Sequence, residues 1–291
     1  MKGGFVLKIK RKSLLYKSGV EYADYCINHI EGCSHGCKFP CYAMNMKKRY
    51  GAIKDYKDWI KPKIVENALG LLDKEIPKLK HKIEVVHLCF MTDPFMYKQK
   101  EVIDLTLKII KRLNDDNIRC TVLTKGIYPK ELINVEKYGR NNEYSITLVS
   151  LDKNFKINFE PGSAPYEDRI KSLKYLHDKG LRTWVSMEPY PSQDLFKQDL
   201  NVILKRISFV DKIIFGKLNY NVKVPNSLDN KAFYDECANT VIDFCKNRGI
   251  DYHIKHGTKK KDNRKTERIF EKPYIKQEFK FCNTTQTQLR I

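Results

Sequence analysis

The sequence of 291 residues contains no long apolar run, no internal repeat and no low-complexity segment. No stretch approaches the roughly 18 apolar residues of a membrane span. The first ten residues lack the apolar centre of a secretory signal, and the composition excludes collagen-like, mucin-like and small disulfide-rich proteins. Since 42% of the residues are hydrophobic, a chain of this length can bury a core of its own. We therefore expect a cytoplasmic protein that does not associate with membranes.

The charge of the chain is strongly positive, with 55 Lys and Arg against 35 Asp and Glu and a net charge of +20. Two interpretations stay open. Lysine, Asn, Ile and Tyr are abundant, which AT-rich coding produces without any binding function. The same excess of positive charge attracts phosphate groups or an acidic partner. The basic run at residues 257–268 is typical of a solvated loop.

Short apolar runs rich in β-branched residues alternate with longer helical patterns. The strand-like runs are residues 25–30, 84–90, 119–124, 143–149, 182–187 and 212–215. The helical patterns are residues 62–76, 100–113, 129–138, 166–179, 194–207 and 230–247, and we expect Pro77 to end the first of them. This alternation predicts parallel βα units in a barrel or a doubly wound sheet. In both folds, function gathers after the carboxyl ends of the strands.

Three of the nine cysteines lie within nine residues, directly after the first predicted strand: Cys33, Cys37 and Cys41. In a reducing compartment, clustered cysteines indicate metal binding or catalysis rather than disulfides. Three thiolates on one short loop are what a cubane iron–sulfur cluster needs if its fourth iron takes a non-cysteine ligand. The alternatives are three unligated thiols or a zinc site, which needs a fourth Cys or His. His35 lies between two of the thiolates and is poorly placed to complete a zinc site.

Six ordered motifs follow one another along the chain. They are Gly-Cys-Ser-His-Gly-Cys…Cys-Tyr-Ala from Gly32, Met-Thr-Asp-Pro-Phe from Met91, Thr-Val-Leu-Thr-Lys-Gly from Thr121, Tyr-Ser-Ile-Thr from Tyr144, Glu-Pro-Gly-Ser-Ala-Pro…Arg from Glu160 and Val-Ser-Met-Glu-Pro from Val185. With these motifs the sequence resembles the radical S-adenosylmethionine (SAM) superfamily, and within it the group of spore photoproduct lyase and DNA repair photolyase-like proteins. One departure is the cysteine spacing, which is Cys-x3-Cys-x3-Cys where the usual motif is Cys-x3-Cys-x2-Cys.

The resemblance implies an α/β fold, namely a partial (β/α)6 barrel of the TIM type. We expect residues 1–218 to form this barrel with an N-terminal extension, and residues 219–291 to form a helical, basic extension that packs on it within the same structural domain. The resemblance further implies that Cys33, Cys37 and Cys41 hold a [4Fe-4S] cluster whose fourth iron SAM chelates.

The activity that the resemblance implies is radical chemistry of the lyase or transferase type. One electron from a flavodoxin or ferredoxin cleaves SAM into methionine and a 5′-deoxyadenosyl radical, which abstracts hydrogen from a substrate. The substrate is not identified by the sequence; a nucleic acid, another phosphate-bearing molecule, a peptide or a small metabolite all fit. The alternative function is a zinc-stabilised nucleic-acid-binding protein without SAM chemistry.

The resemblance also implies which residues bind SAM. Because the cysteine loop is one residue longer than usual, we expect Phe39 or Tyr42 to remake the contact with the adenine. Thr92 and Asp93 follow the second predicted strand, where the superfamily binds the amino group of SAM; an ordinary Asx-Pro turn is the alternative for this pair. Lys125 follows the third strand and is placed to meet the carboxylate.

Four further candidates lie on later strands or directly after them. Ser145 and Thr147 share one face of the fourth strand because side chains alternate with a period of two, and this face would meet the ribose. Glu160 and Glu188 each precede a proline, and they bind the ribose or a SAM nitrogen, or form ion pairs with lysines.

Two residues are candidates for a direct role in catalysis, Cys89 and Tyr97. Cys89 lies near the place of the hydrogen-donor cysteine in spore photoproduct lyases, but it is offset by one residue. That offset turns the side chain of a regular strand to the other face, so a buried packing role is the alternative that we favour for Cys89.

Overall fold

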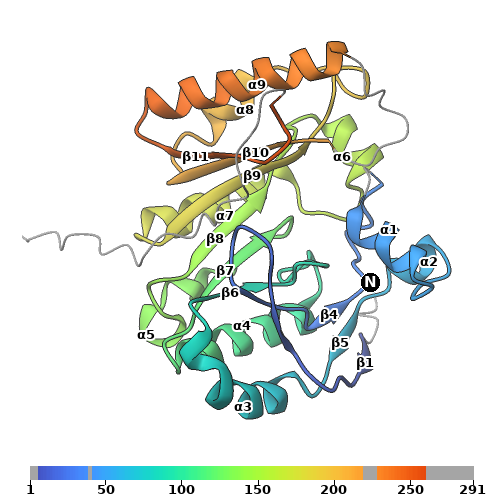
Figure 1. The fold of residues 1–291 in the computed structure, drawn as a ribbon, viewed down its shortest axis with the longest axis vertical. Coiled ribbons are helices and arrows are strands. Elements are labelled where there is room, and N and C mark those ends of the chain that lie inside the picture. The colour runs from blue at the N-terminus through green and yellow to red at the C-terminus, as the bar shows by residue number, and fades with distance from the viewer. Residues whose placement is uncertain (1–5, 39–40, 219–227, 260–291) are drawn as a thin grey trace, which may run out of the picture.

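The computed structural model describes residues 6–38, 41–218 and 228–259. Its centre is an eight-stranded sheet in the order β11-β10-β9-β8-β7-β6-β3-β2. Seven of these strands run parallel. The first six along the chain are β3 (Tyr25–Ile27), β6 (Val85–Leu88), β7 (Arg119–Thr124), β8 (Glu143–Thr147), β9 (Arg182–Tyr190) and β10 (Lys212–Lys217). They coincide with the six predicted strands, and the predicted α/β barrel fold is confirmed (Figure 1).

Several short strands are absent from the sequence prediction. The strand β11 (Asp251–Ile254) extends the sheet parallel to β10, and β2 (Leu15–Lys17) pairs antiparallel with β3 at the other edge. A separate small sheet joins β1 (Leu7–Ile9), β5 (Lys63–Val65) and β4 (Ile30–Glu31). Strands of two to four residues are too short to show a period of two, which is why the sequence does not reveal them.

The helices alternate with the strands in the predicted order. They are α3 (Ala68–Leu79), α4 (Lys100–Asn114), α5 (Val135–Tyr138), α7 (Tyr166–Asp178), α8 (Leu200–Arg206) and α9 (Leu228–Lys246), with short 3-10 turns at η1 (Lys80–Lys82) and η2 (Lys130–Ile133). Four predictions differ in detail. The segment expected to begin the first helix forms β5 instead, and Pro77 lies inside α3, which continues to Leu79. The helix expected at residues 194–207 begins only at Leu200, and the one expected at residues 129–138 is divided into η2 and α5.

Three further helices surround the cysteine loop and have no counterpart in the prediction. They are α1 (Tyr42–Arg49), α2 (Tyr56–Trp59) and α6 (Lys153–Phe159). Their short length and many polar residues give them only a weak apolar period. Among the described residues, no helix is both long and apolar enough to cross a bilayer.

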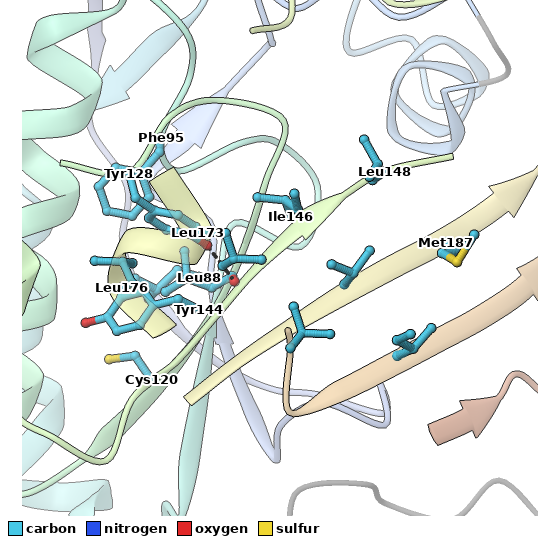
Figure 2. Close-up of a cluster of buried hydrophobic side chains, with 14 of the residues drawn as sticks. Leu88, Phe95, Cys120, Tyr128, Tyr144, Ile146, Leu148, Leu173, Leu176 and Met187 are labelled. Atoms are coloured by element: carbon cyan, nitrogen blue, oxygen red, sulfur yellow. Dashed lines mark hydrogen bonds between the residues drawn. The ribbon is translucent and has the colours of Figure 1, made fainter. Parts of the chain in front are cut away.

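The two faces of the sheet have different environments. Tyr144 and Ile146 of β8 pack into the main core together with Leu173 and Leu176 of α7 (Figure 2). The residues that alternate with them point into the barrel. There, Leu123, Ser145, Trp184 and Lys212 occupy neighbouring positions in one row across β7 to β10, and Tyr22 and Ile214 pack beside Trp184. The barrel interior is therefore lined by both polar and aromatic side chains.

Candidate functional site

The cysteine loop runs from the end of β4 to the start of α1, where Cys41 is the N-cap residue. Burial raises the pKa of Cys33 well above its ordinary value, and the charges of Asp93 and of the other two thiols raise it further. Burial also raises the pKa of Cys37, to about 12, and that of Cys41. The three thiols influence one another and therefore lie close together. As soft sulfur ligands on one loop, they fit an iron–sulfur cluster.

A site for a single metal ion has a different geometry from a cluster, because all its donors converge on one point. Within the part of the chain that the structure describes, no three His, Cys, Asp or Glu side chains converge in this way. The eight cysteines in that part, which exclude Cys282, are all free thiols.

One side of the loop is fixed by α2. The Cys33 amide donates to the Trp59 carbonyl oxygen at 2.8 Å, and the Tyr56 hydroxyl donates to the Gly36 carbonyl oxygen at 2.7 Å. Gly36 has a φ of 56°, a left-handed conformation that glycine adopts without strain. The loop can therefore turn between Cys33 and Cys37 while its backbone stays bonded to α2.

The other side of the loop is fixed by the segment that follows α6. The Lys38 amide donates to the Phe159 carbonyl oxygen, and the Gly162 amide donates to the His35 carbonyl oxygen at 2.9 Å. A Cβ atom at Gly162 would lie 2.2 Å from the Ser34 carbonyl oxygen, so only glycine allows this approach. The Glu160 motif of the sequence thus includes the residue that lets this segment approach the cysteine loop.

His35 connects the loop to the end of β6. Its Nδ1 lies 3.3 Å from Asp93 Oδ2, and its Nε2 accepts a hydrogen bond from the Tyr97 amide at 2.8 Å. Both ring nitrogens are therefore engaged within the protein. His35 therefore has a structural role between two cysteines of the loop.

Asp93 is buried and accepts hydrogen bonds on both carboxylate oxygens. The Thr124 hydroxyl donates to Oδ1 at 2.6 Å, and the Lys125 amide donates to Oδ2 at 2.7 Å. Burial opposes ionisation, but His35 and these hydrogen bonds lower the pKa of Asp93 below its ordinary value. The contact with the SAM amino group that we expect from the sequence would compete with these bonds. Its neighbour Thr92 donates its hydroxyl to the Ile30 carbonyl oxygen at 3.3 Å.

Lys125 and Glu160 form part of a buried ion-pair chain. Lys125 Nζ lies 2.5 Å from Glu160 Oε1, and Arg169 Nη2 lies 2.8 Å from Glu160 Oε2. Burial favours the neutral acid, yet Lys125 and Arg169 hold the pKa of Glu160 at about 2. The charge of Lys125 also lowers the pKa of Cys37 and Cys41 against the effect of burial. Lys125 is therefore close to the thiols, and Glu160 has the ion-pair role that was one of its two alternatives.

Glu188 lies in a second ion-pair cluster, at the last strands of the sheet. Its Oε2 is 3.2 Å from Lys255 Nζ, which also lies 3.0 Å from Glu21 Oε2. The Tyr22 hydroxyl approaches Lys255 Nζ to 3.3 Å. Sequence reasoning does not assign Glu21 and Tyr22, because they precede β3 and reach β9 and β11 only through the path of the folded chain.

The remaining SAM candidates have the following places. Ser145 is buried on the inner face of β8 and donates its hydroxyl to the Val122 carbonyl oxygen at 2.7 Å. Thr147 lies on the same face, and its carbonyl oxygen accepts from Arg169. Tyr42 is exposed at the start of α1. Phe39 lies outside the described residues.

The two catalytic candidates lie on either side of the turn that follows β6. The Cys89 thiol is buried 3.3 Å from His29 Nδ1, among apolar side chains next to the cysteine loop. Cys89 has a φ of 60°, so its backbone has left the strand conformation and the alternation of faces no longer applies. Its surroundings are those of a packing cysteine. Tyr97 is half-buried, and its contact with His35 is made by the backbone amide.

Comparison with known proteins identifies the family. The sequence model of the radical SAM superfamily matches residues 27–193. The chain belongs to this superfamily. An uncharacterised protein of Methanocaldococcus jannaschii is 29% identical to this radical SAM protein over 184 residues, which are 63% of this chain and 67% of that protein. An uncharacterised protein of Acidianus two-tailed virus is 24% identical over 216 residues, which are 69% of each chain.

Solved structures share the radical SAM fold seen here. Spore photoproduct lyase complexed with dinucleoside spore photoproduct superimposes with a TM-score of 0.61 at 14% identity, over 85% of this chain and 80% of that chain. A variant of the same enzyme with bound AdoMet and the dinucleoside gives a TM-score of 0.60 at 12% identity, with the same coverage. At this level of identity the likeness shows a common fold.

Proposed function

We propose that this protein is an enzyme that reductively cleaves SAM at a [4Fe-4S] cluster held by Cys33, Cys37 and Cys41. The observation that carries the proposal is the set of three thiols on one loop, fixed from two sides beside the charged Lys125. The bound cofactors supply the chemistry, which is a 5′-deoxyadenosyl radical that abstracts hydrogen from the substrate. The chain's own residues hold and orient these groups and exclude water.

Lys125 is the residue that we assign to the carboxylate of SAM. Lys125 is only slightly exposed. Burial opposes its charge, but Glu160 and Cys37 raise its pKa, and its ammonium group donates to one oxygen of Glu160. Arg169 donates to the other oxygen of the Glu160 carboxylate. An anion that approaches the thiols thus meets a lysine already held in place.

The substrate that we favour carries nucleic-acid groups. Two observations support this choice: the neighbour of similar fold is complexed with a dinucleoside photoproduct, and the net charge is +20. We further propose that the reaction is of the lyase or transferase type, takes place in the cytoplasm and uses an electron from a flavodoxin or ferredoxin.

The test is the formation of 5′-deoxyadenosine by anaerobically reconstituted, dithionite-reduced protein. Cys33→Ala, Cys37→Ala and Cys41→Ala should each abolish it, whereas Cys26→Ser, a half-buried cysteine in β3, should retain it. Single-stranded oligonucleotides added to the assay should stimulate SAM cleavage. If the wild-type protein carries zinc, binds oligonucleotides and does not cleave SAM, the alternative function of a zinc-stabilised nucleic-acid-binding protein would be supported instead.

A further inference from the structure

The helices α1 and α2 form a basic surface next to the cysteine loop. They lie together outside the strands of the barrel (Figure 1). Residues 42–63, which contain both helices, include seven Lys or Arg and two Asp, with no Glu. We call this surface the α1–α2 basic face and define it by Lys47, Lys48, Arg49, Lys54, Lys57 and Lys61.

The nearby acidic groups do not neutralise this charge. Glu31 is shared by three cations, with Arg11 and Lys47 at 3.4 Å and Lys63 at 3.6 Å. The two aspartates accept hydrogen bonds from backbone amides at the start of α2. Asp55 accepts from the Asp58 amide, and Asp58 accepts from the Lys54 amide. A surplus of positive charge is left. Lys48, Arg49, Lys54, Lys57 and Lys61 are exposed to solvent, whereas Lys47 is half-buried beside Glu31.

The same helices contact the backbone of the cysteine loop directly. Tyr56, between Lys54 and Lys57, donates its hydroxyl to the Gly36 carbonyl oxygen in the middle of the cysteine loop. Burial raises the pKa of Tyr56, and the charges of Cys37 and Cys33 raise it further. The phenol is only half-buried, so one aromatic side chain connects the exposed basic face with the cysteine loop.

We propose that the α1–α2 basic face is the docking surface for an acidic one-electron donor protein. This inference rests on the proposed function, which consumes one electron for each SAM cleaved. The donor is oxidised by one electron, and the cluster held by the cysteines is reduced by one, from [4Fe-4S]2+ to [4Fe-4S]+. Electron transfer through protein falls steeply with distance, so the donor must dock near the thiols, and the Tyr56–Gly36 hydrogen bond joins this face to their loop.

The charge and the expected size of such a complex agree with this face. Complementary charges steer two proteins together and raise the association rate by about 10- to 1,000-fold at low ionic strength. Complexes for electron transfer are small, usually below about 1,200 Å² of buried surface, which two short helices can provide. A nucleic-acid substrate, in contrast, must reach the SAM site that we propose at Lys125, and the basic face lies on helices outside the strands.

The test compares two reductants on charge-reversed variants of the full chain. The docking variant carries Arg49→Glu, Lys54→Glu and Lys57→Glu. The matched control carries Lys74→Glu, Lys78→Glu and Lys82→Glu, which are exposed and lie at α3 and the turn after it. The rate of 5′-deoxyadenosine formation is measured with limiting reduced flavodoxin, an acidic donor, and separately with dithionite. Carbodiimide cross-linking of the donor, mapped by mass spectrometry, gives a second readout that does not need activity.

With flavodoxin at low ionic strength, the docking variant should be at least about tenfold slower than the control variant, and added salt should reduce this difference. With dithionite, both variants should match the wild type. The cross-links between wild-type protein and flavodoxin should map to lysines of the α1–α2 basic face. Equal rates with flavodoxin, or cross-links elsewhere, would overturn the docking surface. A docking variant that loses only its affinity for oligonucleotides would assign this face to nucleic acid, and this result would also overturn the proposed docking of the donor. Wild-type protein inactive with dithionite would instead refute the proposed function.

Discussion

His35 Nδ1 lies 3.3 Å from Asp93 Oδ2 and joins the cysteine loop to the end of β6. The same carboxylate accepts hydrogen bonds from the first residues after β6 and from the end of β7. A single buried aspartate thus holds three segments together. The order of the cysteine loop depends on this pair, although neither residue is a proposed metal ligand.

Replacement of His35 should therefore impair cluster binding. His35→Ala leaves the buried Asp93 carboxylate without one of its partners, which costs about 1–3 kcal/mol of unfolding free energy. We expect a reconstituted protein with less than half of the wild-type iron content and a lower melting temperature. His81→Ala, an exposed histidine in η1, is the control and should match the wild type in both measurements. Full iron content in His35→Ala would refute the structural role.

Glu160 should make stability depend on pH in the acid range. The pKa of Glu160 is lowered from 4.5 to about 2 in the folded protein, so its contribution is complete above pH 4.5 and is lost as the pH falls towards 2. Glu160→Gln removes the negative charge that Lys125 and Arg169 share and should cost about 3–5 kcal/mol at pH 7. Urea unfolding at pH 7, 5 and 4 measures the free energy of unfolding of both proteins. The difference between variant and wild type should become smaller only at pH 4.

The control for this prediction is Glu131→Gln, which removes an exposed pair with Lys137. An exposed pair contributes at most about 1 kcal/mol, so this variant should unfold almost like the wild type at every pH. A Glu160→Gln protein as stable as the wild type at pH 7 would contradict the buried ion-pair chain.

Cys89 should be dispensable for SAM cleavage. Its thiol is buried beside His29, and burial raises its pKa to about 12, so it remains neutral. Cys89→Ala should lower the unfolding free energy by about 1–2 kcal/mol, as removal of a small buried side chain does. The rate of 5′-deoxyadenosine formation per bound cluster should stay within twofold of the wild type. A large loss of that rate at full iron content would restore Cys89 as a catalytic candidate.

Lys255 should stabilise the closure between the first and last strands of the sheet. It links Glu21, which precedes β3, to Glu188 of β9. Lys255→Met leaves two carboxylates facing each other and should lower the unfolding free energy by about 2 kcal/mol, a value reduced from that of a fully buried pair because Lys255 is partly exposed. The Lys255→Met, Glu21→Gln double variant should recover part of this loss. No recovery in urea unfolding would contradict the link.

The sequence predicts the six parallel strands because buried parallel strands are continuous apolar runs between helices. It also indicates the three thiols, because their density on one loop is a local signal. The partners of Glu160 and Glu188 are not predictable in the same way. Arg169 and Lys255 are two of many basic residues, and Glu21 lies 234 positions before Lys255. Only the path of the folded chain selects these pairs.

The central claim is that Cys33, Cys37 and Cys41 hold a cluster to which SAM binds. The most direct measurement is electron paramagnetic resonance of the anaerobically reconstituted, dithionite-reduced protein, before and after SAM is added, together with iron and sulfide analysis. We predict about four irons and four sulfides per chain and a spectrum that changes on addition of SAM, both lost when any of the three cysteines is replaced by alanine. A colourless protein that carries zinc, or a spectrum that SAM leaves unchanged, would contradict the account.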